Sequence, residues 1–101
     1  MVILTAHNTI RAEALEAVVQ DYAEMMRLVR ENEPGCILYQ VHSNQDSSAD
    51  FMVYEVYRDQ AAFETHIKTP YFQDIVVNRI RPHVISQHRT FWEAHEPSAY
   101  E

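Results

Sequence analysis

Glycine and cysteine are almost absent from the 101-residue sequence, which has one of each, Gly35 and Cys36. Loops that cradle phosphates depend on glycine, so a single glycine excludes a P-loop and a dinucleotide-binding fingerprint. One cysteine can form neither an intrachain disulfide nor a two-cysteine metal clamp. Cys36 precedes an apolar run, and this position favours a buried structural thiol.

Basic residues are also few, since 8 Lys and Arg are set against 15 Asp and Glu, for a formal net charge of −7 at pH 7. Nucleic acids and anionic membranes bind surfaces rich in Lys and Arg, so neither is expected as a partner. The first residues, MVILTA, have no basic leader, and no run is long enough to span a membrane. These features predict a cytoplasmic location.

The composition that remains is that of a soluble globular protein, with 47% hydrophobic and 23% charged residues. A chain of this length can bury the core of one ordinary domain but not of two. We predict a single domain over residues 1–95. Residues 96–101 form an acidic tail that is either loose or crosses to a partner chain.

Apolar periodicity predicts strands at 2–10, 36–43, 51–58 and 83–92. It predicts a helix over 12–32, which Pro34 ends while Gly35 takes the turn. Asp59 is a plausible N-cap for a second helix, and Thr69 with Pro70 repeats this signal for a third one that Pro82 closes. The polar run SNQDSSAD, between the two middle strands, is expected to be a long hairpin loop.

The resulting order, β-α-β-β-α-β, is that of a ferredoxin-like α+β fold with an antiparallel four-stranded sheet and helices on one face. Apolar or aromatic residues are also expected on the other face, among them Ile3, Tyr39 and Val41. An apolar sheet face of this size usually marks an interface. We therefore expect a homodimer in which two sheets close on each other.

Histidine is the most frequent of the residues that could carry chemistry, with six in the chain. His7, His42 and His88 fall in predicted strands and could bind a metal if they shared one face, but the pattern does not show that they do. No metal site is predicted.

Two polar residues lie in apolar surroundings. Asn8, within a strand, must find hydrogen bonds, either to a neighbouring backbone group or to a substrate in a pocket. His66, beside Phe63 and Ile67 on a helix, either fills the groove between helix and sheet or acts as a base.

Glu55 interrupts an apolar strand, and an exposed edge is the simpler explanation. If it is buried, it needs a cation such as Arg58, Arg79 or Arg89. Aromatic side chains suit core or dimer packing at least as well as a ligand site; those concerned are Tyr54, Tyr57, Tyr71, Phe72 and Trp92.

Several short motifs together resemble the antibiotic biosynthesis monooxygenase superfamily. They are E-P-G-C at 33–36, Tyr54-Glu55, His66 shortly before Thr69-Pro70, and the aromatic Phe72. The resemblance covers essentially the whole chain. It implies a ferredoxin-like dimer whose two sheets form a dimeric α+β barrel.

Members of this superfamily include cofactor-independent monooxygenases of quinols and polyphenolic polyketides, haem-degrading enzymes, and isomerases of phosphorylated autoinducer-2. The haem-degrading members carry a Trp at the position of His66 and a His ligand where this chain has Ile75 and Val76. The isomerases have a further His in the first helix, which is replaced here near Met26 or Arg27.

The resemblance thus implies a monooxygenase that needs no cofactor and acts on a small, quinol-like aromatic substrate. The alternatives are an autoinducer-2-phosphate-type isomerase and a non-catalytic dimeric binding or stress-response module. For the monooxygenase we expect His66 as base and Asn8 as hydrogen-bond donor. Phe72, Trp92 and Tyr54 are the expected substrate-binding residues.

Overall fold

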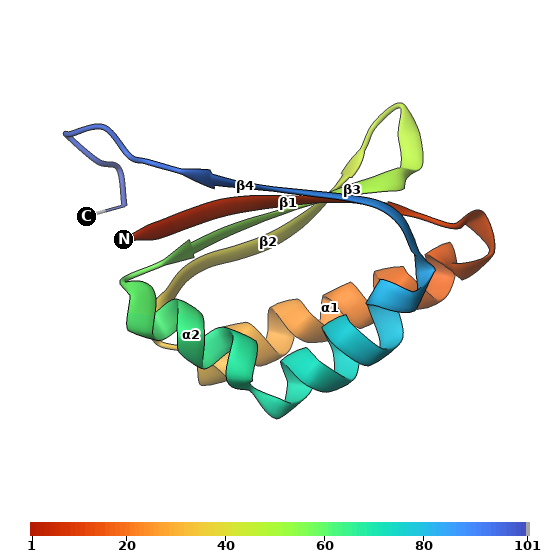
Figure 1. The fold of residues 1–101 in the computed structure, drawn as a ribbon, viewed down its shortest axis with the longest axis horizontal. Coiled ribbons are helices and arrows are strands. Elements are labelled where there is room, and N and C mark those ends of the chain that lie inside the picture. The colour runs from red at the N-terminus through yellow and green to blue at the C-terminus, as the bar shows by residue number, and fades with distance from the viewer. Residues whose placement is uncertain (101) are drawn as a thin grey trace.

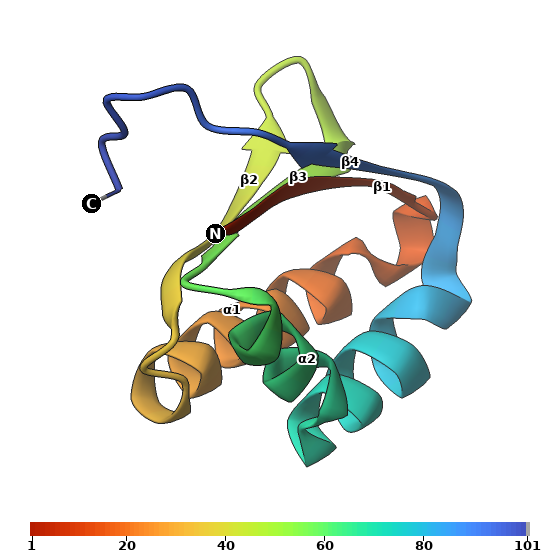
Figure 2. The same cartoon turned by 60° about the vertical axis from the view of Figure 1, so that its left-hand side comes forward.

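The computed structural model describes residues 1–100, which form a four-stranded antiparallel sheet with all helices on one face (Figures 1 and 2). The strand order is β2-β3-β1-β4, and the predicted ferredoxin-like α+β fold is confirmed. In chain order the elements are β1 (Val2–Ile10), η1 (Ala12–Ala14), α1 (Leu15–Asn32), β2 (Cys36–Asn44), β3 (Ser47–Tyr57), α2 (Gln60–Lys68), η2 (Phe72–Ile80), η3 (Arg81–His83) and β4 (Val84–Trp92).

The core lies between the sheet and the helices. In α1 the buried side chains recur at helical spacing, and they are Val18, Tyr22, Met25 and Val29. Alternate residues of the strands meet them, among them Ala6, Ile10 and Val53. In the described part of the chain, no helix is both long and apolar enough to cross a membrane.

The connection between β2 and β3 is shorter than predicted. Asn44 pairs with Ser47, so only two residues form the turn, and the amide of Asp46 donates to Oδ1 of Asn44 at 2.8 Å. The expected long loop is therefore wrong. The polar residues of this segment continue the two strands because they pair with neighbouring strands. Asp50, for example, accepts a hydrogen bond from Thr9 Oγ1 of β1 at 2.8 Å.

The predicted signals for helix starts are confirmed. Oδ1 of Asp59 accepts from the amide of Ala62 at 2.8 Å, and Oγ1 of Thr69 accepts from the amide of Phe72 at 3.2 Å. The helix that follows Thr69, η2, is a π-helix. It buries Ile75 and Ile80 against the core, as the sequence predicts.

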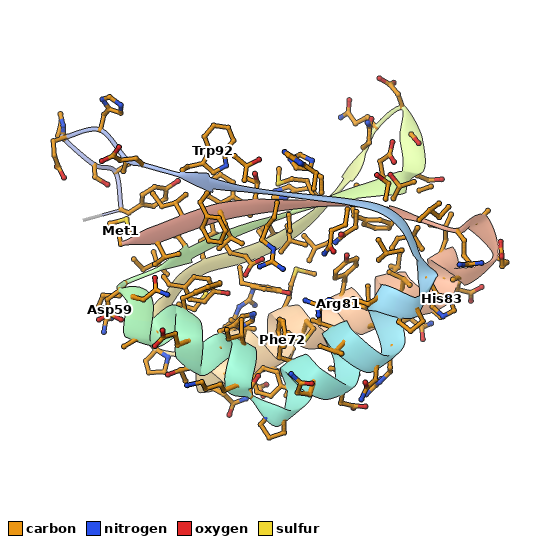
Figure 3. All side chains as sticks on the ribbon, viewed as in Figure 1. Met1, Asp59, Phe72, Arg81, His83 and Trp92 are labelled. Atoms are coloured by element: carbon orange, nitrogen blue, oxygen red, sulfur yellow. The ribbon has the colours of Figure 1, made fainter. Side chains whose placement is uncertain are left out.

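The outer face of the sheet, opposite the helices, carries no helix from residues 1–100 (Figure 1). Tyr39 pairs with Glu55 on the helix side, so the expectation that Tyr39 and Val41 line the outer face is wrong. Leu38 takes that place in β2. Trp92 stands on the outer face with 56% of its surface exposed, on the opposite side of the sheet from Phe72 (Figure 3).

His42, His7 and His88 do share this outer face, because the register aligns them in one row with Met52 between the first two. Nevertheless, no group of three His, Cys, Asp or Glu side chains within residues 1–100 could hold a metal ion.

After β4 the chain returns toward the outer face (Figure 1). There the hydroxyl of Tyr100 forms a hydrogen bond with that of Tyr54. Of the expected acidic tail at 96–101, Glu101 lies outside the described residues.

Gly35 is needed for a close approach and not for a left-handed turn, since its φ is not positive. A Cβ at this position would lie 2.7 Å from Cβ of Ala62, which is in the first turn of α2. The glycine therefore allows the segment after α1 to touch α2.

Gly35→Ala is expected to lower the free energy of unfolding by about 1–3 kcal/mol, since the added methyl group overpacks this contact. The measurement is urea unfolding followed by circular dichroism. Ala62→Gly, which costs about 1 kcal/mol of helix propensity alone, should recover part of the loss in the double variant. Strictly additive losses would show that the contact is not the cause.

Candidate active site

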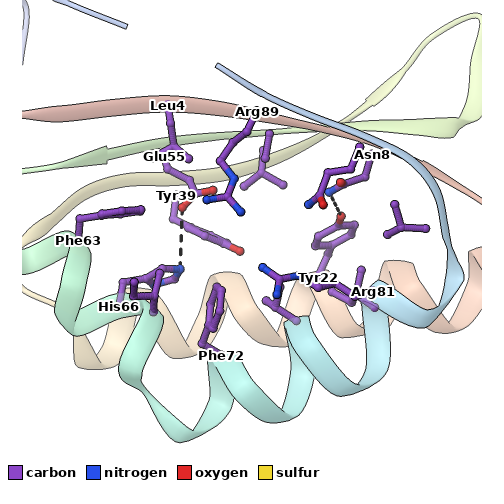
Figure 4. Close-up of a pocket in the computed structure, with 17 residues that line it drawn as sticks. Leu4, Asn8, Tyr22, Tyr39, Glu55, Phe63, His66, Phe72, Arg81 and Arg89 are labelled. Carbon is purple, nitrogen blue, oxygen red and sulfur yellow. Dashed lines mark hydrogen bonds and ion pairs between the residues drawn. The ribbon is translucent and has the colours of Figure 1, made fainter. Parts of the chain in front are cut away.

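A cavity of about 60 Å³ lies between the sheet and the helices (Figure 4). On its sheet side the small residue Ala6 is flanked by Val53 of β3 and Arg89 of β4 in the cross-strand register. Because the side chain of Ala6 is only a methyl group, space remains between the longer side chains of Val53 and Arg89. The other lining residues are Leu4, Asn8, Tyr22, Tyr39, Glu55, Phe63, His66, Ile67, Phe72, Val76, Ile80, Arg81, Val84 and Gln87.

His66 is held at one end of the cavity by Glu33. Nδ1 of the imidazole lies 3.0 Å and 3.1 Å from the two carboxylate oxygens of Glu33, and both residues are buried. The Tyr71 hydroxyl donates to the same carboxylate. Because a carboxylate only accepts, Nδ1 carries the proton, and Nε2 of a neutral His66 is left as the basic nitrogen.

Glu55 lies beside this nitrogen, with its Oε1 3.8 Å from Nε2 of His66. It accepts a hydrogen bond from Tyr57 at 2.6 Å and is 8% exposed, so the simpler expectation of an exposed edge is wrong. Burial raises the pKa of Glu55, while the Tyr57 hydroxyl and the positive charges of His66 and Arg89 oppose this rise.

Three aromatic rings surround the imidazole. The ring centroids of Phe72, Tyr57 and Tyr39 lie 5.2, 5.3 and 5.4 Å from that of His66. Burial, together with the charge of Glu55, raises the pKa of Tyr39 and of Tyr57. Both phenols therefore stay neutral, and the site is a largely apolar enclosure around one imidazole.

Asn8 lies in the same cavity, next to Tyr22 (Figure 4). Its Nδ2 donates to the Tyr22 hydroxyl at 2.9 Å, and its buried Oδ1 has no hydrogen-bond partner among residues 1–100. With the amide turned over, Tyr22 would donate to Oδ1 and the NH₂ group would be free instead. In either orientation one polar atom of Asn8 is left for a ligand, and no backbone group takes it.

The structure thus brings together His66, Asn8 and Phe72 of the expected site residues. Tyr54 and Trp92 do not line this cavity, because strand alternation points them to the outer face. There Nε1 of Trp92 donates to Oγ1 of Thr5 at 2.9 Å.

Six cavity residues with polar groups were not recognised in the sequence as parts of a site, namely Tyr22, Tyr39, Glu55, Arg81, Gln87 and Arg89. Glu33, behind His66, was also not recognised as a site residue, although it opens the E-P-G-C motif that offered the signal. Cys36 takes no part as a nucleophile, since burial raises the pKa of its thiol to about 12.

The fold and this site define a ferredoxin-like α+β protein with a buried histidine in an enclosed cavity. The family model for antibiotic biosynthesis monooxygenase matches residues 1–78, and the chain belongs to this family.

Solved structures agree over nearly the whole chain. A crystal structure of an antibiotic biosynthesis monooxygenase is 27% identical with a TM-score of 0.87, and the match covers 94% of this chain and 99% of that one. The fold also matches PA3566 from Pseudomonas aeruginosa (23% identity, TM-score 0.84, 93% of each chain). It matches Rv0793 from Mycobacterium tuberculosis as well (21% identity, TM-score 0.83, 96% of this chain and 98% of that one).

A curated relative, the uncharacterized protein sll1783 of Synechocystis, is 35% identical over 66 residues. The match covers 65% of this chain and 42% of that protein, so the matched part spans less than half the length of the relative.

The burial of Glu55 predicts a specific pH dependence of stability. Its pKa in the folded state is above the ordinary value of 4.5, so the native protein retains a proton that the unfolded chain has lost. The stabilisation by protonated Glu55 is fully present below the pKa that this residue has in the unfolded chain. It is lost as the pH rises through the pKa in the folded state, by about 1.4 kcal/mol for each pH unit between the two pKa values. In Glu55→Gln this loss should be missing.

The measurement is the free energy of unfolding by urea at a series of pH values for the wild type and for Glu55→Gln. Glu64→Gln, on the exposed face of α2, is the matched control and should follow the wild type at every pH. If Glu55→Gln also runs parallel to the wild type, Glu55 does not titrate as described.

Proposed function

We propose that the chain is a monooxygenase that needs no cofactor and oxidises a small quinol-type aromatic with molecular oxygen. The observation that carries this proposal is the placement of His66, with Nε2 as its basic nitrogen, and Asn8, with one unpartnered amide atom, in one aromatic-lined cavity. A base and a hydrogen-bond partner for the reacting oxygen are what such a reaction needs from a protein.

In the first step Nε2 of His66 takes the proton of a substrate hydroxyl. Glu33 accepts the hydrogen bond from Nδ1, fixes the orientation of the ring and stabilises the imidazolium that forms. Asn8 stabilises the substrate oxyanion by donating from its NH₂ group, which is free when the amide is turned over and Tyr22 donates to Oδ1 instead.

In the second step the substrate anion gives one electron to oxygen. The resulting superoxide and substrate radical combine, and a carbon–oxygen bond forms. The peroxide anion so formed takes back the proton from Nε2 of His66. Loss of the ring C–H proton with cleavage of the oxygen–oxygen bond then releases water and leaves one oxygen atom on the ring. For hydroquinone the balance is one quinol and one O₂ to one hydroxyquinone and one water. The aromatic enclosure of Phe72, Tyr39 and Tyr57 keeps water from the radical pair.

His66→Gln is expected to lower the rate of oxygen uptake with quinols by about 10²–10⁴-fold, because the general base is lost while an amide remains to donate to Glu33. Asn8→Ala should cost about 10²–10³-fold, as removal of one oxyanion donor does. The measurement is oxygen consumption by purified protein with a panel of quinols, corrected for autoxidation in buffer.

His95→Ala is the matched control, since His95 is exposed and does not line the cavity. Circular dichroism establishes that each variant is folded. Uptake equal to the buffer blank for every quinol would contradict the oxygenase activity. Full activity in both His66→Gln and Asn8→Ala would contradict only the roles assigned to these residues.

We also propose that the protein is a homodimer whose sheets meet through their outer faces. This is supported by a sheet face without a helix on it, where Trp92 and Leu38 are 56% and 37% exposed. Burial of these side chains against a second copy would remove apolar surface from water.

Sedimentation equilibrium at micromolar concentration is expected to give twice the 11.9 kDa mass of one chain. Leu38→Asp should shift the equilibrium toward the monomer, because it places a charge in the interface. Glu64→Gln, on the helix side, should leave it unchanged. A wild type that sediments as a monomer would overturn this proposal.

A further inference from the structure

Two arginines at the cavity, Arg81 and Arg89, have no partner among residues 1–100, with neither a hydrogen bond nor an ion pair to either guanidinium group. Most other arginines of the chain are engaged. Arg11 and Arg27 pair with glutamates, Arg58 donates to a backbone carbonyl, and Arg79 contacts Asp21, Glu24 and Asp74. In a chain of net charge −7, two unengaged guanidinium groups at one cavity need an explanation.

The two guanidinium groups reach the cavity from opposite layers of the fold (Figure 4). Arg89 comes from β4, where it pairs with Ala6, and its neighbour on the same face, Gln87, pairs with Asn8. Arg81 follows η2, and its Cζ lies 5.6 Å from the ring centroid of Phe72, so it is positioned by a cation–π contact. Both lie between the His66 end and the Asn8 end of the cavity.

Glu55 is the one internal anion that could account for Arg89, since the charge of Arg89 lowers its pKa. The two side chains nevertheless form no ion pair within 4.0 Å, and Glu55 already accepts from Tyr57 and lies near His66. No carboxylate within residues 1–100 forms an ion pair with Arg81. Both arginines remain exposed to solvent at the cavity mouth, so their charges are tolerated without a partner and are available to one.

We infer that Arg81 and Arg89 form a subsite for a carboxylate carried by the aromatic substrate. Guanidinium groups bind carboxylates through paired, charge-assisted hydrogen bonds, and a ring bearing the carboxylate would stack beside Phe72. This inference rests on the proposed function and narrows its substrate class from quinols in general to quinols with an acidic substituent.

A carboxylate fits the subsite better than a phosphate does. Two buried carboxylates, Glu33 and Glu55, lie at the His66 end of the same enclosure and oppose further negative charge. The two guanidinium groups carry two positive charges, and the nearby buried carboxylates offset part of this. A carboxylate with one negative charge is therefore repelled less in this enclosure than a phosphate monoester, which carries nearly two at neutral pH.

The test is binding in the absence of oxygen, so that no turnover occurs, measured by isothermal titration calorimetry. Three ligands are compared, namely hydroquinone, gentisate, which is hydroquinone with one carboxylate, and hydroquinone monophosphate. Gentisate is expected to bind about tenfold or more tightly than hydroquinone, and increasing salt should weaken the binding of gentisate but not that of hydroquinone.

Arg81→Gln and Arg89→Gln should each weaken gentisate binding about tenfold, and the double variant should bind gentisate and hydroquinone equally. Arg30→Gln is the matched control. Arg30 is exposed, lies away from this cavity and also has no partner among residues 1–100, so its loss changes the net charge equally without changing the preference.

Equal binding of gentisate and hydroquinone by the wild type would overturn the inference, as would a preference for gentisate that survives in the double variant. Arginine-dependent binding of the phosphate that matches or exceeds that of gentisate would overturn the choice of a carboxylate. Oxygen uptake separates this inference from the proposed function. A preference for gentisate that depends on the arginines, without oxygen uptake, would support the subsite and contradict the oxygenase activity. Oxygen uptake with quinols, without a preference for gentisate, would support the oxygenase activity and contradict the subsite.

Discussion

The hydrogen bond between His66 and Glu33 is the contact on which the arrangement of the molecule depends. It joins the residue that ends α1 to the last turn of α2, and through Glu55 it reaches β3. A buried carboxylate and a buried imidazole each need the other, because either one alone would be left unsatisfied in an apolar enclosure. The close approach of Gly35 to Ala62 lets this contact form. The same bond also places the proton of a neutral His66 on Nδ1 and leaves Nε2 free to accept a hydrogen bond.

The order of elements could be predicted from the sequence because its signals are local. Asp59 and Thr69 mark helix starts through hydrogen bonds to amides three residues ahead, and such contacts can be read from spacing alone. The periodicity of α1 is equally local. The hairpin loop was predicted wrongly because pairing with a neighbouring strand, which is not a local property, decides where a polar strand ends.

The candidate site could be predicted only in part, for the same reason. His66 and Asn8 stand out because each is a polar residue in an apolar segment. Glu33 is separated from His66 by 33 positions, and no spacing rule connects them. Tyr54 and Trp92 were expected beside His66 and Asn8 but lie on the outer face, because the phase of a strand is set by its register in the sheet. Glu55 shows the reverse case, a charged residue that stays inside because Tyr57 of the same strand donates to it and His66 of α2 lies beside it.

Ala6 determines how much substrate the enclosure can admit. It is the smallest side chain on the sheet side of the cavity, and its neighbours in the register, Val53 and Arg89, extend past it on either side. Every methylene added at this position would reduce the volume of the cavity, because the surrounding interior is closely packed. His66 and Asn8 could then keep their positions while the cavity lost room for larger rings. Under the proposed function, the size of the substrate and its chemistry would thus be set by different residues, the first by a single methyl group.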